Sequence, residues 1–182
     1  KGSLVKKPSP NLMKQLGIGY LTENRRDEGL FLELGVDVNI TITDLNKIKN
    51  KYRLLSRQKE ESLTKYVIDL LRIATPSASQ LAGKLSGGNQ QKVVIGKWIH
   101  LEPDIFIMDE PTKGIDVGAK NELYNLINEI AEKGMSVLLI SSEIEEIMGI
   151  CDRVAVMANG ALVAMLEGDN ISQSEIIRYA MS

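Results

Sequence analysis

The chain has 182 residues, and its hydrophobic fraction of 43% suits one packed domain with a smaller insert. Its 22 basic and 24 acidic residues give a net charge of −2, which argues against a nucleic-acid partner. The single cysteine, Cys151, cannot form an internal disulfide, so we expect a small buried thiol in a reducing compartment. Apolar runs are strand-sized, so we expect no direct membrane insertion.

The first half of the chain shows one strand and one helix clearly. Residues 1–16 are polar and contain Pro, which favours an edge strand followed by a loop. Residues 17–21 predict a short strand, and residues 22–27 a charged loop. Residues 30–56 have only weak periodicity. Apolar positions from about Gln58 to Ile73 recur at helical spacing and predict an amphipathic helix.

The second half alternates between helix and strand. Two capping boxes, Ser142-x-x-Glu145 and Ser172-x-x-Glu175, predict the starts of two short helices. This alternation predicts an α/β fold with a sheet of parallel strands. The remaining predicted elements are a helix from about Gly88 to Leu101, a strand over Ile105–Met108, a helix over residues 118–133 ended by Gly134, a strand over Ser136–Ser141, and a hairpin of residues 154–157 and 162–166 turning at Asn159-Gly160.

Two carboxylates, Asp109 and Glu110, follow the apolar strand directly. They lie at its C-terminal end, where α/β sheets place their ligands. One carboxylate there can hold Mg²⁺ through water, and the next can polarise an attacking water. The alternative interpretation is two solvated acids before the turn at Pro111.

A small-residue turn, residues 86–88 (Ser-Gly-Gly), opens the helix that precedes this strand. Glycines let the backbone approach a ligand closely, and the first N–H groups of a helix point outward with the positive end of its dipole. The turn therefore suits a phosphate group. The alternative is a flexible turn with a serine cap.

Together these motifs resemble an ABC-type ATPase domain, because LSGGNQQKV and the acidic pair have the order and spacing of its signature and Walker B motifs. The segments IGYLTENRRDEG, DEPTKGIDVGAKNELYNLI and LLISSEIEEIMGICDRVAVMANG are similar to the Q-loop, the Walker B and D-loop, and the switch region of the second ATPase half of ribose-, galactose- and xylose-type importers. The resemblance implies a P-loop NTPase-like parallel sheet core with a helical subdomain.

The resemblance also implies domains, ligands and site residues. The expected domains are residues 1–29 (residual core and Q-loop region), 30–84 (helical subdomain) and 85–182 (signature helix with the α/β core). The expected ligands are ATP and Mg²⁺. The implied site comprises Glu110 as the catalytic residue, Ser86, Gly87, Gly88, Asn89, Gln90, Asp116 and Ser142 around the nucleotide, and Asp109 and Glu23 at the metal.

Three features depart from the general ABC pattern. The chain contains no Gly-x-x-x-x-Gly-Lys-Ser/Thr loop, the Q-loop Gln is matched by Glu23, and the switch His is matched by Ser142, which we expect to cap a helix. The lone histidine, His100, is expected on the surface at the end of the signature helix. We hypothesise that this signature completes the ATP site of a partner half, while Asp109 and Glu110 belong to a second, degenerate site. We expect the chain alone to be inactive.

The implied function is that of the ATP-binding C-terminal half of a sugar importer. Its expected partners are an N-terminal ATPase half, membrane permease subunits and an extracytoplasmic sugar-binding protein, at the cytoplasmic face of the cell membrane. The alternative is a non-hydrolysing nucleotide clamp. A soluble ABC ATPase of DNA repair or translation ranks lower, because neither coiled-coil arms nor a basic surface is visible in the sequence. The identity of the sugar is left open.

Overall fold

The computed structural model describes residues 4–181, which divide into two compact units at residues 138/139. The first unit contains most of a three-stranded sheet and the helices around it, and the second contains a two-stranded hairpin and two helices. The predicted α/β fold is confirmed. None of the helices formed by the described residues is long and apolar enough to span a membrane.

The central pair of strands consists of β1 (Ile18–Leu21) and β2 (Ile105–Asp109), which run parallel. The strand order is β1-β2-β3, where β3 is Ser136–Ile140. Phe106 and Met108 of β2 are fully buried. Because parallel strands end at the same edge, the segments that follow β1 and β2 lie side by side, which positions the candidate site.

Two helices flank this site, α4 (Gly87–Ile99) and α5 (Val117–Glu132). Each begins at an oxygen-bearing cap, Ser86 for α4 and Asp116 for α5. The predicted end of α5 is confirmed, because Gly134 adopts a left-handed φ of 93° just beyond it. The apolar face of α5 is buried through Leu123, Leu126, Ile127 and Ile130.

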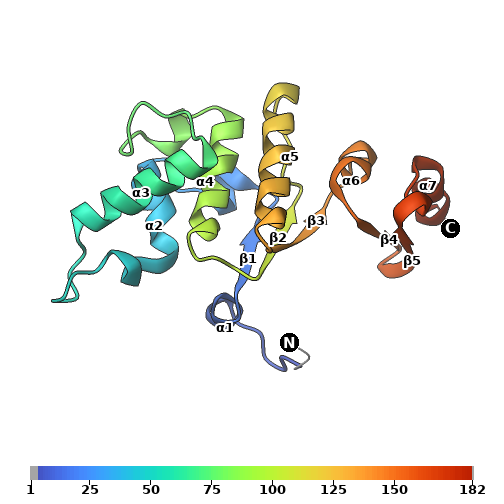
Figure 1. The fold of residues 1–182 in the computed structure, drawn as a ribbon, viewed down its shortest axis with the longest axis horizontal. Coiled ribbons are helices and arrows are strands. Elements are labelled where there is room, and N and C mark those ends of the chain that lie inside the picture. Colours follow the sequence, from blue (N-terminus) through green and yellow to red (C-terminus); the bar gives the residue numbers. More distant parts are fainter. Residues whose placement is uncertain (1–3, 182) are drawn as a thin grey trace. The chain divides into compact units, whose positions relative to one another are not determined.

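Residues 30–84 fold as a helical segment against α4. Figure 1 shows α2 (Val36–Thr41) and α3 (Arg57–Leu71) beside α4, and both contact it. Weak periodicity hid α2 and the 3₁₀ segment η2 (Ile42–Ile48) because these elements are short. A 3₁₀ turn, η3 (Ala82–Lys84), leads into the signature. The boundaries predicted at 29/30 and 84/85 stay predictions.

The N-terminal predictions need two corrections. Residues 10–15 form helix α1 (Pro10–Gln15), not part of an edge strand and loop, because Ser9 caps the helix and Pro10 occupies its first position. The part of that prediction on residues 1–3 lies outside the described residues. The predicted loop at 22–27 overlaps a π-helical turn, η1 (Arg25–Gly29), which Asn24 caps.

The second unit is built on the predicted hairpin, β4 (Arg153–Ala158) and β5 (Ala161–Glu167). Asn159 and Gly160 both have positive φ, as a tight two-residue hairpin turn requires. The 3₁₀ turn η4 (Gly168–Asn170) follows. Val154, Val156, Leu166 and Ile176 form the buried core, against which Cys151 packs partly buried.

One of the two predicted capping boxes is wrong. Ser172 does cap α7 (Gln173–Ala180) and accepts a hydrogen bond from the Glu175 N–H. However, the N-cap position of α6 (Ile144–Ile150) is Glu143, and the Glu143 N–H donates to Ser141 Oγ. Ser142 therefore lies one position too early to cap α6.

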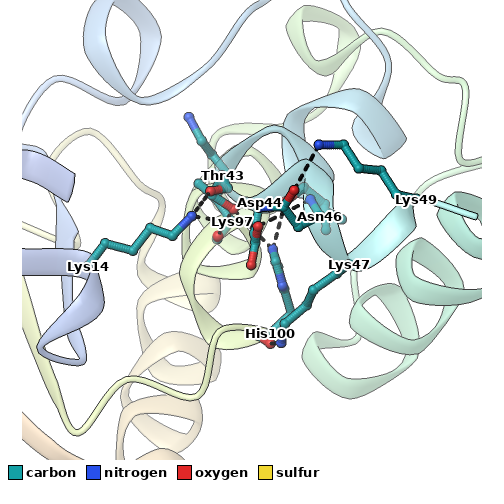
Figure 2. A network of polar contacts seen from close by, with 9 residues as sticks. Lys14, Thr43, Asp44, Asn46, Lys47, Lys49, Lys97 and His100 are labelled. Carbon is teal, nitrogen blue, oxygen red and sulfur yellow. Dashed lines mark hydrogen bonds and ion pairs between the residues drawn. The ribbon is translucent and has the colours of Figure 1, made fainter. Parts of the chain in front are cut away.

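The predicted surface location of His100 is also wrong. His100 is only 4% exposed, because α2 and η2 cover the end of α4. The His100 Nε2 lies 3.0 Å from Thr43 Oγ1 and 3.1 Å from the Ile40 carbonyl. Lys47 donates a hydrogen bond to the His100 backbone carbonyl (Figure 2). Burial, followed by the charge of Lys47, lowers the pKa of His100, so the ring is a neutral core group.

Candidate functional site

The signature turn is held by a local hydrogen-bond network. Asn89 Nδ2 donates to Ser86 Oγ at 2.9 Å, and Asn89 Oδ1 accepts from the Ala74 N–H at 2.7 Å. Ser86 also accepts a longer bond, 3.5 Å, from the Asn89 N–H as the cap of α4. Asn89 thus fixes the serine hydroxyl and ties it to the loop after α3. The N–H groups of residues 87–88 begin the helix and have no intrahelical acceptor.

A pocket of about 590 Å³ opens beside this turn, between the end of α3, the first half of α4 and most of the length of α5. Four of the predicted nucleotide-binding residues line it: Ser86, Gly88, Asn89 and Asp116. Asp116 Oδ1 accepts from the Ala119 N–H at 3.0 Å, so it caps α5 at the pocket edge. A Cβ at Gly88 would lie 2.8 Å from the Ala119 Cβ, so glycine lets α4 and α5 meet.

The other two predicted nucleotide residues on α4 lie elsewhere. Gln90 is 4% exposed, and its Nε2 donates to the Ala82 carbonyl at 3.2 Å. This side chain supports the turn before the helix and does not face the pocket. Gly87 lies against the guanidinium of Arg25. Ser142 precedes α6 in the second unit.

Sequence reasoning missed Lys92, whose side chain is only 9% exposed in the pocket wall. Its Nζ lies 2.8 Å from Glu122 Oε2 and donates to the Arg72 carbonyl at 3.1 Å. The hydrogen bond and charge of Lys92 lower the pKa of the Glu122 carboxyl. Helical spacing could have indicated that Lys92 lies beside the signature turn, because Lys92 follows Gly88 by about one turn on the same face of the helix. The positive charge of Lys92 is balanced by Glu122 within the pocket wall.

The acidic residues form a second cluster at the ends of β1 and β2. Asp109 Oδ2 accepts from the Tyr20 hydroxyl at 3.1 Å. Burial, followed by that hydrogen bond, raises the pKa of Tyr20, so the phenol stays a donor at neutral pH. Glu110 has a left-handed φ of 45°, a strained conformation for a residue with a side chain. Lys113 Nζ lies 2.5 Å from Glu23 Oε1.

The predicted site residues thus fall into two groups. The pocket-lining residues, within the described part of the chain, include none of Glu23, Asp109 and Glu110. The signature pocket and the acidic cluster are therefore different places on the first unit. This division is what a domain needs if its signature and its acids act on different nucleotides.

The acidic cluster fits Mg²⁺ only together with phosphate. Within residues 4–181, no three Asp, Glu, His or Cys side chains gather as a metal cage. Mg²⁺ bound to nucleotide keeps waters and needs only one or two protein carboxylates, which Asp109 satisfies. The Glu23 carboxylate is already paired with Lys113, so that ammonium competes with a metal there.

A family model described as ABC transporter matches residues 11–113, more than half of the chain. The chain belongs to the ABC transporter family. This ABC transporter chain is 46% identical over 172 residues to a ribose import ATP-binding protein, RbsA 2, of Escherichia coli O157:H7, covering 94% of this chain and 34% of that protein. It is 44% identical over 179 residues to a galactose/methyl galactoside import ATP-binding protein, MglA, of Fusobacterium nucleatum, covering 98% and 36%.

The ABC transporter chain thus spans about a third of the length of the curated relatives it matches. Its fold is also that of solved cassettes. A nucleotide-free ATP-binding cassette from an ABC transporter superposes with a TM-score of 0.75 at 23% identity, covering 96% of this chain and 69% of that one. An ATP-binding cassette in its ADP conformation gives a TM-score of 0.76 at 22% identity, covering 96% of this chain and 72% of that one.

Proposed function

We propose that this chain is the second ATPase half of an ABC sugar importer, and that residues 86–88 complete the ATP site of the partner half. The observation that carries the proposal is the separation of the signature pocket from the acidic cluster. A nucleotide held by a partner would enter the pocket, while Asp109 and Glu110 would face another nucleotide. Relatives named for ribose import and for galactose/methyl galactoside import support the sugar class.

The chemistry at the signature follows from its donors. The N–H groups of residues 87–88 and the Ser86 hydroxyl would donate to terminal phosphate oxygens, aided by the positive end of the α4 dipole. Asn89 orients that hydroxyl through its 2.9 Å bond to Ser86 Oγ. Donors fixed before the reaction stabilise negative charge without reorganisation, which is the main contribution to phosphoryl transfer.

In the acidic cluster, Asp109 would hold Mg²⁺, which neutralises phosphate charge when bound. Glu110 would orient and polarise the attacking water. The ion pair between Glu23 and Lys113, and the neutral hydroxyl of Ser142 at the switch position, support a weaker or degenerate second site.

The proposed partners follow from the family. They are an N-terminal ATPase half, permease subunits that contact the helical segment 30–84, and an extracytoplasmic sugar-binding protein. The chain would work at the cytoplasmic face of the membrane. In this proposal, residues 1–29 form the residual core and Q-loop region, and residues 85–182 carry the signature, the Walker B acids and the switch.

The test is ATP hydrolysis by the complete importer carrying Ser86→Arg or Glu110→Gln. We expect Ser86→Arg to abolish hydrolysis, because the arginine side chain would fill the space that the phosphate needs. Glu110→Gln should leave hydrolysis near normal if its site is degenerate. The matched control is Ser56→Arg, which changes the cap of α3 in the same unit outside the pocket lining. Undiminished hydrolysis in Ser86→Arg would refute the proposal.

The second candidate is a non-hydrolysing nucleotide clamp, favoured by the Glu23–Lys113 pair. It predicts that Glu110→Gln changes neither nucleotide binding nor hydrolysis in any state of the importer. If Glu110→Gln and Ser86→Arg both abolish hydrolysis, the clamp reading is wrong, and the acidic cluster takes part in turnover.

A further inference from the structure

One side chain contacts segments that adjoin both groups of predicted site residues. Arg25, at the start of η1, donates from Nη1 to the Lys113 carbonyl at 2.6 Å and from Nη2 to the Gly114 carbonyl at 3.0 Å. Both carbonyls belong to the turn that joins Glu110 to Asp116. Both terminal nitrogens of the guanidinium therefore donate to the same turn. A planar guanidinium supports this two-bond geometry better than a lysine ammonium does.

The same guanidinium abuts the signature. A Cβ built on Gly87 would lie 2.9 Å from Arg25 Nη2 and 3.4 Å from the Gly114 carbonyl oxygen. The first distance is shorter than a real Cβ shows, so a side chain at position 87 would displace the guanidinium tip, whereas the second is an ordinary van der Waals contact. The signature turn and the 112–116 turn (the turn from Thr112 to Asp116) thus adjoin each other, and both lie against one cation.

The positive charge of Arg25 would be unfavourable at this position without the carbonyls that it binds. A cation beside the N-terminus of α4 is repelled by the positive end of the helix dipole. The carbonyls of Lys113 and Gly114 offset that repulsion. Burial, followed by the charge of Arg26, lowers the pKa of Arg25, although an arginine stays charged near neutral pH. The two carbonyls therefore stabilise the guanidinium beside Gly87.

We propose that Arg25 is a positioning residue that couples the signature turn to the 112–116 turn. A shift of the 112–116 turn, on binding or loss of a nucleotide at the acidic cluster, moves the guanidinium and with it Gly87. The pocket and the acidic cluster then change together, although they hold different nucleotides. The activity readout rests on the proposed function, whereas the coupling itself does not.

The first experiment compares Arg25→Met with Arg26→Met in the complete importer. Arg26 is the exposed neighbour and serves as the matched control. Arg25→Met should lower kcat about tenfold or more while KM for ATP changes less than about threefold, because the signature acts on the closed, reacting state. Arg25→Lys should keep part of the activity, since an ammonium can bind one carbonyl. Equal kinetics of the two methionine variants would overturn the proposal.

A double variant tests the contact with Gly87. Gly87→Ala should lower kcat in the wild-type background, and adding Arg25→Met should lower it little further. The reason is that either change breaks the same contact, so the two effects do not multiply. Fold-changes that multiply fully would show that Arg25 and Gly87 act independently, which contradicts the coupling.

Amide hydrogen exchange of the purified protein decides the coupling without any ATPase assay. The Ile115 N–H is bonded to the Thr112 carbonyl at 3.1 Å, and the Asn89 N–H is bonded to Ser86 Oγ. Arg25→Met should speed exchange in both turns, and Arg26→Met should not. If the wild-type importer hydrolyses no ATP, the proposed function fails while this readout stands. Unchanged exchange in Arg25→Met would refute the coupling.

Discussion

Lys113 and Glu23, which lie 90 residues apart in the chain, form an ion pair with Nζ 2.5 Å from Oε1. The pair joins the segments that follow β1 and β2. The hydrogen bond that Lys113 donates to Glu23, followed by the charges of Glu23 and Glu110, raises the pKa of Lys113. The resemblance assigns Glu23 to a metal, but in the structure its carboxylate is paired with Lys113.

We predict that Lys113→Met strengthens Mg²⁺-dependent nucleotide binding by the importer. The substitution removes the ammonium that competes for Glu23, so half-saturation should occur at a lower Mg²⁺ concentration in a titration at fixed ATP. The Lys113 and Glu23 side chains are 62% and 51% exposed, so thermal stability should hardly change. Lys84→Met, at an exposed lysine of the same unit, is the control. An unchanged Mg²⁺ requirement would show that Glu23 plays no part in metal binding.

Two helix-capping serines in the first unit, Ser86 and Ser56, allow an effect on stability to be distinguished from an effect on ATP hydrolysis. Ser86→Ala and Ser56→Ala each remove a helix cap, and each should cost about 1 kcal/mol in a denaturation experiment. Only Ser86→Ala should also lower ATP hydrolysis, because its hydroxyl faces the pocket. Equal hydrolysis by the two variants would mean that the Ser86 hydroxyl serves the helix alone.

His100 makes the stability of the first unit depend on pH. Its folded pKa is lowered by burial and by Lys47, with Asp44 opposing, whereas the unfolded ring titrates near 6.5. Below pH 6.5 the unfolded chain binds a proton that the folded chain does not, so stability falls as pH falls toward the folded pKa. Above 6.5 this contribution is constant.

The matched variant is His100→Gln, whose amide can still donate toward Ile40 and Thr43 without titrating. Melting temperatures between about pH 7.5 and 5.5 should fall more for the wild type than for this variant. Parallel curves for the two proteins would mean that His100 becomes protonated in the folded chain as readily as in the unfolded chain.

Gly96 sets the distance between α3 and α4. A Cβ there would lie 2.7 Å from Val67 Cγ1 and 3.4 Å from Leu71 Cδ1. We predict that Gly96→Val lowers the free energy of unfolding by about 1–3 kcal/mol in urea, through overpacking. Val67→Ala should partly rescue it by making room. Gly149→Ala, on α6 with no neighbour within 4 Å, should instead be neutral or stabilising. A neutral Gly96→Val would show that the two helices can separate freely.

Local sequence patterns determined the elements whose signals are short-range. The strand before Asp109, the helix after Gly88 and the hairpin turn at Asn159-Gly160 all form as predicted. Their apolar periodicity and turn residues act within a few positions, so neighbouring residues suffice to specify them. Ser86, Asn89 and Asp116, which the resemblance assigns to the nucleotide, line one pocket of about 590 Å³, and their role stays a prediction.

Tertiary structure decided what depends on contacts between distant segments. No local pattern shows that α2 and η2 bury His100, that Lys113 reaches Glu23, or that Arg25 lies against Gly87. Each of these depends on the parallel pairing of β1 with β2 and on the packing of residues 30–84 against α4. The sequence by itself indicated which groups suit a phosphate. The fold decided which of them share a pocket, because burial and pairing arise only when segments far apart in the chain come together.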